Sequence, residues 1–440
     1  MFSTRSAGTR SAGFWVVVLA ATANYTVLSA SAPLLSRAVP DVLGGDEALA
    51  GTLVSITGLT GAACMTLVGI ATSRYGPRAV TLVSAAVAVL GVGALVALFT
   101  VPGVVAGRVV YGIGNAGITV ATTAWVSVTA PAGTRGRALG YYGISVWVGL
   151  ALGPVLGENL YAASGNAATW AGLLAVQGVA LVAAASVAAP PRPAPPAPPV
   201  PLRVAASAAS AASAVPAVPA ASAASAVPAV PAATGPGRAR AVVAVVRAPA
   251  LVALCAWGAQ GVFTTFLVQH LQSRGVPAAG VLGASSIFLV FAAAVVAARF
   301  ALGSLPDRLG PVTTTRGALV AVAAGLAGMA VADSFWTAAA AAVLLGVGYA
   351  PLYPSLTLLS TAALPDPLRP PAIGVFSAAT SLGMAAGAFG GGVLIAAAGS
   401  VTALACGAVL QLLVLPAVRA PRLPAGAGAG ARPVPAVDAR

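Results

Sequence analysis

Residues 303–311 read Gly-Ser-Leu-Pro-Asp-Arg-Leu-Gly-Pro, and residues 69–77 read Gly-Ile-Ala-Thr-Ser-Arg-Tyr-Gly-Pro. The two stretches share Gly, Arg, Gly and Pro at the same spacing, 234 residues apart. The same offset brings further pairs into register: Gly112 with Gly346, Gly114 with Gly348, Arg135 with Arg369, Gly140 with Gly374, Gly149 with Gly383, Gly153 with Gly387 and Gly157 with Gly391. An offset that holds over this length without a gap predicts an internal repeat of two related halves.

The composition indicates a membrane protein. Of the 440 residues 59% are hydrophobic and only 7% are charged, whereas a soluble domain carries about 25% charged residues. A membrane-spanning helix needs roughly 20 apolar residues. Breaks at Gly, Pro and Arg clusters divide the apolar sequence into twelve candidate spans: 14–36, 49–71, 79–101, 103–130, 138–162, 168–189, 249–271, 278–301, 313–332, 335–362, 372–397 and 400–418. We therefore expect an all-α polytopic membrane protein with twelve transmembrane helices in two pseudo-symmetric six-helix bundles.

The Pro-rich and Ala-rich stretch between the halves predicts a linker. It begins Pro-Pro-Arg-Pro-Ala-Pro-Pro at residue 190 and contains the nonamer Ser-Ala-Val-Pro-Ala-Val-Pro-Ala-Ala twice. Proline at this density breaks helices and favours extended or disordered chain. We expect five parts: a cytoplasmic N-terminus (1–13), an N-terminal bundle (14–189), a disordered cytoplasmic linker (190–248), a C-terminal bundle (249–419) and a disordered tail (420–440).

The arginines indicate an orientation. All 22 basic residues are arginine and the formal net charge is +14. With the N-terminus in the cytoplasm, every arginine except Arg37, Arg108 and Arg274 falls on the inner side of the predicted spans, as the positive-inside rule requires. We expect a multi-pass protein of the cell membrane with both termini cytoplasmic. The positive charge is therefore explained by the orientation of the protein in the membrane, and nucleic-acid binding is not expected.

The inventory of reactive side chains is small. The chain has one His and no Lys, and its three cysteines, Cys64, Cys255 and Cys406, lie far apart in apolar stretches. This predicts no disulfide, no metal site and no cofactor. Without Lys there is no phosphate-binding GxxxxGK[ST] motif, so a self-contained ATP-driven pump is excluded. We expect no enzymatic activity.

Several motifs resemble those of the major facilitator superfamily across the whole membrane part. Residues 303–310 are similar to the loop signature Gly-x-Leu-x-Asp-Arg-x-Gly, whereas the loop after the second span has Ser73 where the family usually has Asp. Arg108-Val-Val-Tyr-Gly-Ile-Gly114 is similar to the arginine motif of the fourth span. In the fifth span, Gly140, Gly149, Gly153-Pro154 and Gly157 resemble the exporter motif G-x8-G-x3-G-P-x2-G-G, with Glu158 in place of the last Gly.

The resemblance implies coupling and gating residues in the loops and in the fourth span. It implies that Asp307, with Arg308 and Arg74 in the two related loops, latches the halves in the outward-facing state. By the repeat, Asp307 faces the start of the fifth span near Arg135 and Arg137; a purely topogenic loop is the alternative. The resemblance also implies a proton-transfer role for Arg108.

The fifth span adds further candidates. Ionisable residues inside a membrane are functional candidates by default, which singles out Glu158 and His270, with an interfacial position as the alternative for each. Gly149, Gly153 and Gly157 follow small-xxx-small spacing, which lets helices approach closely, and Pro154 removes a backbone donor. We expect these four residues to form a hinge and a tight interface between the halves, with simple close packing as the other interpretation.

Polar and aromatic residues within the spans are candidates for a substrate cavity, although aromatic residues at helical spacing also serve packing. The candidates are Asn24, Tyr25, Asn115, Tyr142, Trp147, Gln260, Phe263, Tyr349 and Tyr353. A cavity with few fixed charges suits a neutral or amphipathic compound.

The expected function is efflux of such a compound by alternating access, driven by the proton motive force. The alternative is a proton symporter that imports a sugar or small metabolite. The expected partners are the lipid bilayer, a small-molecule substrate and protons, and the protein is expected to be a monomer.

Overall fold

The computed structural model describes residues 12–130, 135–187, 236–365 and 368–420. In these ranges the regular structure is helical throughout. The elements are α1 (Ala12–Ala38), η1 (Val39–Leu43), α2 (Glu47–Tyr75), α3 (Pro77–Ala97), α4 (Val101–Thr129), α5 (Arg135–Ser186), α6 (Pro236–Ser273), η3 (Ala284–Ser286), α7 (Ile287–Leu302), α8 (Leu305–Leu309), α9 (Pro311–Val331), α10 (Phe335–Thr361), α11 (Arg369–Leu413) and η5 (Leu415–Ala417).

Ten helices of the described chain are long and apolar enough to cross a membrane. Two of them are far longer than one crossing needs, since α5 has 52 residues and α11 has 45. Each is interrupted by one glycine with non-helical backbone angles, Gly165 (φ 74°, ψ −176°) in α5 and Gly399 (φ 82°, ψ 162°) in α11. Both glycines lie where the sequence predicts a break between two spans.

The internal repeat is confirmed in the backbone. Gly76 (φ 87°) joins α2 to α3, and Gly310 (φ 79°), 234 residues later, joins α8 to α9. The following helices α3 and α9 both start with proline and both have 21 residues. The starts of α4 and α10, the starts of α5 and α11, and the interrupting glycines Gly165 and Gly399 obey the same offset.

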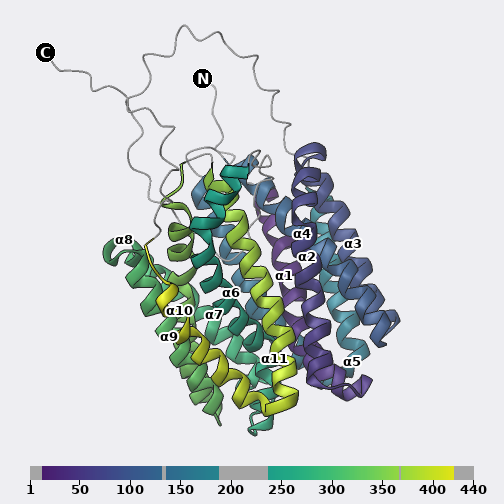
Figure 1. Cartoon of the computed structure of the whole chain (residues 1–440). Helices are drawn as coiled ribbons and strands as arrows, with labels where there is room; N and C mark the ends of the chain where they lie inside the picture. Colours follow the sequence, from purple (N-terminus) through teal and green to yellow (C-terminus); the bar gives the residue numbers. More distant parts are fainter. Residues whose placement is uncertain (1–11, 131–134, 188–235, 366–367, 421–440) are drawn as a thin grey trace, which may run out of the picture.

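The helices lie side by side, and each half has its own internal packing (Figure 1). In the first half (α1–α5), α1 packs against α5 and α3 against α4. In the second half (α6–α11), the equivalent pairs are α6 with α11 and α9 with α10. The halves meet mainly where α2 packs against α11, with smaller contacts of α1 with α6 and of α5 with α7.

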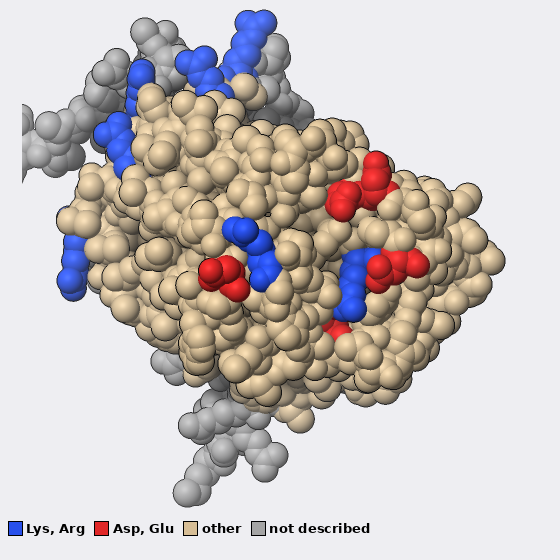
Figure 2. All heavy atoms as spheres, turned by 90° about the horizontal axis from the view of Figure 1, so that it is seen from below, with Lys and Arg blue, Asp and Glu red and all other residues tan. Residues whose placement is uncertain are grey.

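Four acidic residues and five arginines mark the two ends of the helices. Asp41, Asp46, Glu47 and Asp333 lie in or beside the turns at one end, here called the acidic end. Figure 2 shows this end from below, with its acidic side chains and the arginines beside some of them. Arg74, Arg78, Arg308, Arg316 and Arg419 lie at the opposite end, here called the basic end.

Two predicted boundaries are wrong. The linker was predicted to reach residue 248, but α6 already begins at Pro236; the intervening stretch is rich in Ala, Val and Arg, which a helix accommodates. The span predicted over 278–301 becomes helical only at residues 284–287, because Gly275 and Gly280 adopt positive φ and form a turn before it. Residues 188–235 of the linker, 1–11 and 421–440 lie outside the described residues.

Candidate functional site

A cavity of about 220 Å³ lies between the two halves. Its wall in the first half comes from α1, α2, α4 and α5: Tyr25, Leu28, Ser29, Ala32, Val54, Ser55, Thr57, Gly58, Gly61, Ala62, Met65, Arg108, Asn115, Trp147, Leu150 and Pro154. Its wall in the second half comes from α6, α7 and α11: Trp257, Gln260, Gly261, Thr264, Thr265, Phe288, Phe291, Ala292, Thr380, Ser381, Met384, Ala385 and Ala388. Both halves contribute, so a movement of one half against the other changes the cavity.

A larger apolar hollow of about 740 Å³ lies along α6 and α11. It is lined by residues such as Leu254, Leu394 and Leu413, and none of its lining residues comes from the first half. A movement between the halves does not open or close it directly. The cavity between the halves is therefore the candidate site.

The predicted cavity residues divide into two groups. Tyr25, Asn115, Trp147 and Gln260 line the cavity, as do Arg108 and Pro154 from the predicted coupling set. The remaining five are not part of the lining: Asn24, Tyr142, Phe263, Tyr349 and Tyr353.

Hydrogen bonds and ring contacts explain why these five lie behind the wall. The Tyr349 hydroxyl donates to the carbonyl oxygen of Ala256 at 2.6 Å. The Tyr142 hydroxyl bonds Thr122 Oγ1 at 2.9 Å, and Asn24 Nδ2 donates to Asn115 Oδ1 at 2.8 Å. Phe263 and Tyr353 are buried against other aromatic rings. These contacts all lie within one half, and a sequence pattern does not reveal them.

The aromatic wall of the second half includes three residues that the sequence did not single out, Trp257, Phe288 and Phe291. The Trp257 ring lies 6.1 Å from that of Tyr349, and Phe291 lies 6.1 Å from Trp147 of the first half. A signal was present in the sequence. Four lining residues of α6, Trp257, Gln260, Gly261 and Thr264, follow the spacing i, i+3, i+4, i+7 that marks one face of a helix.

Arg108 is held by neutral groups. Its side chain is 2% exposed, and its Nε and Nη2 donate to the carbonyl oxygens of Leu53 (3.3 Å) and Val54 (2.9 Å) on α2. Its Nη1 donates to the Ser31 hydroxyl on α1 at 2.7 Å. The guanidinium therefore ties α4 to α1 and α2 while its charge lies at the cavity wall.

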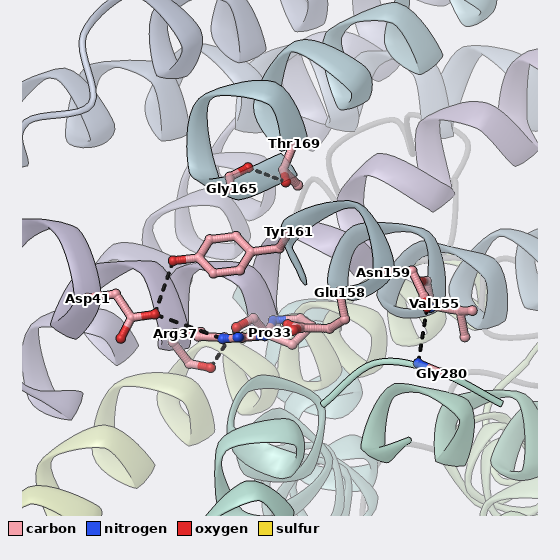
Figure 3. A network of polar contacts seen from close by, with 11 residues as sticks. Pro33, Arg37, Asp41, Val155, Glu158, Asn159, Tyr161, Gly165, Thr169 and Gly280 are labelled. Atoms are coloured by element: carbon pink, nitrogen blue, oxygen red, sulfur yellow. Dashed lines mark hydrogen bonds and ion pairs between the residues drawn. The ribbon is translucent and has the colours of Figure 1, made fainter. Parts of the chain in front are cut away.

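Glu158 lies in a charged network towards the acidic end (Figure 3). Its side chain is fully buried, and Oε2 accepts a hydrogen bond of 2.6 Å from Arg37 Nη1 on α1. Its other oxygen, Oε1, is buried without a hydrogen-bond partner. Arg37 also lies 3.9 Å from Asp41 Oδ2, which accepts from the Tyr161 hydroxyl at 3.1 Å. Pro154, one helical turn before Glu158, lines the cavity.

The described hydrogen bonds that join the halves both lie near the acidic end. Gln269 Nε2 on α6 donates to Glu47 Oε1 on α2 at 3.0 Å. The backbone N–H of Gly280 donates to Asn159 Oδ1 on α5 at 3.0 Å, beside Glu158 in the sequence (Figure 3). Neither bond was predicted from the sequence, because each joins residues more than 100 positions apart.

The loop residues at the basic end are exposed. Arg74 lies over the ring of its neighbour Tyr75, with the guanidinium carbon 5.4 Å from the ring centre. Asp307 and Arg308 lie on the short helix α8, and among the described residues no ion pair links Asp307 to a cation. The side chains of Arg135 and Arg137 lie outside the described residues, so the implied latch stays a prediction.

The glycines of α5 pack inside the first half, which corrects the predicted interface between halves. A Cβ added at Gly149 would lie 2.7 Å from the carbonyl oxygen of Thr22, and one at Gly153 would collide with Thr26, both on α1. Gly157 faces Leu34 of the same helix. The close contact between halves comes instead from α2 and α11, where a Cβ at Gly51 would collide with the backbone of Ala388.

His270 is fully used by contacts in the second half. Its Nδ1 lies 2.8 Å from Ser400 Oγ, and its Nε2 lies 3.0 Å from the carbonyl oxygen of Met329. A carbonyl can only accept, so Nε2 carries a hydrogen, and the Ser400 hydroxyl can satisfy a neutral Nδ1. This arrangement favours a packing role over the predicted alternative of a coupling role.

Apolar helices in related halves around a shared cavity define the class of membrane transporters. The family model of the Major Facilitator Superfamily matches residues 14–339 and 281–437. The chain belongs to this superfamily. Membership of this superfamily supports secondary transport across a membrane.

Similar proteins agree with this assignment. The chain is 31% identical over 150 residues to the MFS-type transporter gkaD of Penicillium citrinum, a match that covers 34% of this chain and about a quarter (26%) of that protein. Its fold is similar to that of a mutant of the nucleoside transporter NupG, with a TM-score of 0.70, 12% identity and coverage of 92% and 98%. An auto-inhibited POT family peptide transporter gives a TM-score of 0.70, 13% identity and coverage of 93% and 96%. These likenesses in structure concern the fold alone.

Proposed function

We propose that the protein is a proton-coupled exporter of small amphipathic compounds in the cell membrane. In this proposal α5 and α11 each cross the membrane twice, and the chain turns between the two crossings at Gly165 in α5 and at Gly399 in α11. This gives twelve spans in two six-helix bundles. Both termini lie in the cytoplasm, so the basic end is the inner end. The protein works as a monomer.

The observation that carries the proposal is the burial of Glu158 beside Arg37. One oxygen of this buried carboxylate is bonded to a guanidinium and the other has no partner. An ionisable group buried in this way within a membrane helix is a candidate for a functional role. When Glu158 takes up a proton, its charge-assisted bond to Arg37 weakens. Arg37 then keeps Asp41, 3.9 Å away, as its carboxylate partner.

The position of Glu158 connects the proton to the movement of the halves. Pro154 on the cavity wall lies one turn away on α5, and Asn159 holds Gly280 of the other half. A change in charge at residue 158 therefore acts next to both the cavity and an inter-half hydrogen bond. We propose that a proton from the outside favours opening at the acidic end and that its release inside favours the reverse.

An efflux screen tests this function. Cells that lack their own exporters, with and without the full chain, are loaded with fluorescent amphipathic compounds, and retention is compared with and without a protonophore. We expect lower retention with the wild-type chain, and loss of this difference with the protonophore or with Glu158→Gln. Asp333→Asn, which changes an exposed carboxylate at the same end, is the matched control and keeps efflux.

The screen also has contradicting outcomes. Efflux that survives both the protonophore and Glu158→Gln contradicts proton coupling through this residue. Higher accumulation in energised cells with the wild-type chain contradicts export and favours the symporter alternative.

A further inference from the structure

Two arginines beside the cavity have no carboxylate partner at ion-pair distance among the described residues. Among the described residues, both ion pairs with an N–O distance of 4.0 Å or less involve Arg37. Arg108 lines the cavity and is bonded to neutral oxygens. Arg299 on α7 has a buried Nε atom with no hydrogen-bond partner.

Arg299 is not itself a lining residue of the cavity, but it contacts the lining residue Trp147 on the side of the basic end. It follows the lining residue Phe291 by about two turns of α7. Its guanidinium carbon lies 5.4 Å from the ring centre of Trp147, which lines the cavity from the opposite half. The repeat offset relates Arg299 to Met65, another lining residue. A substrate that enters from the basic end therefore meets Arg299 and Trp147 together.

Arg299 and Trp147 together offer hydrogen-bond donors to a substrate. A guanidinium carries only donors, and Trp147 Nε1 is likewise a buried donor without a partner. Uncompensated charge inside a membrane protein is costly and normally faces a partner of opposite sign. A carboxylate on the substrate supplies that partner and accepts from both residues.

We infer that the cavity takes an amphipathic organic anion whose carboxylate pairs with Arg299 beside Trp147. The apolar body of the substrate packs against Trp257, Phe288 and Phe291. This inference rests on the proposed transport function and narrows its substrate class.

One feature of the wall suits the opposite charge, so the test includes a cation. Ser55 Oγ donates to the carbonyl oxygen of Thr52 at 2.7 Å, and Thr264 Oγ1 donates to that of Gln260 at 2.9 Å. These hydroxyls offer only lone pairs to the cavity, which an amine can use.

Equilibrium binding to the purified full chain in detergent provides the test. The probes are 1-naphthylacetic acid, its neutral amide and 1-naphthylethylamine, and two-ring and three-ring homologues of each, measured by calorimetry at neutral pH. We expect each carboxylate that binds to bind at least about tenfold more tightly than its amide, the scale of one charge-assisted hydrogen bond. Arg299→Gln is expected to remove this preference while amide binding stays within about twofold.

Matched variants separate recognition from folding. Arg299→Lys keeps the charge and retains part of the preference, and Trp147→Phe keeps the ring but loses the indole donor, weakening the carboxylate alone by several fold. Arg316→Gln changes an exposed arginine that donates to the carbonyl oxygen of Val418 and leaves binding unchanged. Amide binding shows in each case that the variant is folded.

The inference is overturned if no carboxylate binds more tightly than its amide, if the amine binds best, or if Arg299→Gln keeps the full preference for the carboxylate. Binding at equilibrium needs no gradient. A failure of proton-driven efflux therefore leaves this result standing, and a failure here leaves the efflux screen standing.

Discussion

At the scale of single residues, partners decide which charged side chains are available for function. Arg108 is bonded to backbone carbonyls and a hydroxyl, and His270 to a serine and a carbonyl. Glu158 has a charged partner on one oxygen only. The sequence named all three as candidates, because charge in an apolar helix is visible there. It could not rank them, because their partners come from other helices.

The Arg37–Glu158 pair makes a stability prediction. Removing one member of a buried ion pair leaves the other charge without compensation, which costs about 3–5 kcal/mol. Arg37→Gln is therefore expected to lower the melting temperature of the detergent-solubilised chain, and the double variant Arg37→Gln with Glu158→Gln is expected to recover most of that loss. Equal melting temperatures for the single and double variants would show that the pair is not coupled.

At the scale of helices, glycine and small residues set the distances between elements. The sequence predicted the positions of the turn glycines well, because Gly76 and Gly310 are followed by Pro, which starts a helix. It predicted the small-residue stripe of α5 correctly but assigned it to the wrong contact. Spacing defines which face of a helix is small, whereas the helix that packs there depends on the tertiary fold.

Packing of α5 on α1 can be tested with a pair of glycines. A side chain at Gly153 collides with Thr26 and Ser29 of α1, whereas a Cβ at Gly178 has nothing within 4 Å. Gly153→Val is expected to destabilise the protein by about 1–3 kcal/mol through overpacking, and Gly178→Val to leave it near the wild type. Thermal unfolding of both variants in the same detergent measures this difference in stability, and equal stability would contradict the described packing.

The contact between Asn159 and Gly280 predicts local protection at the acidic end. Removing the acceptor with Asn159→Ala frees the Gly280 N–H, so hydrogen–deuterium exchange is expected to rise in residues 274–286. Asn166→Ala is the matched control, because Asn166 bonds Trp170 within the first half. Unchanged exchange in residues 274–286 with Asn159→Ala would show that this hydrogen bond does not hold the halves together.

At the scale of the whole molecule, the chain consists of two related halves that share one acidic end and one basic end. The offset of 234 residues relates helix starts and interrupting glycines in both halves, and the acidic end, which Figure 2 shows from below, lies opposite the basic end. The repeat and the family were accessible from sequence because loops keep Gly, Pro and Arg at fixed spacing. The cavity wall could be predicted only in part from the sequence. Trp257 and Phe291 line the cavity because of how the two halves pack together, and a sequence pattern does not contain that information.

The proposed orientation can be measured by labelling from outside intact cells. In a chain with its three cysteines replaced by alanine, Asp333→Cys places a thiol at the acidic end and Ser73→Cys places one at the basic end; both positions are exposed. A membrane-impermeant maleimide is expected to react with the first in intact cells and with the second only after permeabilisation. The opposite pattern would reverse the assignment of inside and outside.

The central claim is that Glu158 couples proton movement to transport, and reconstituted vesicles test it most directly. With a substrate identified by the efflux screen, the full chain is compared with Glu158→Gln and Asp333→Asn in two assays: exchange of substrate at equal pH, and accumulation driven by a pH gradient. We predict that Glu158→Gln retains exchange but loses accumulation, while Asp333→Asn retains both. Accumulation by Glu158→Gln at the wild-type level would contradict the claim.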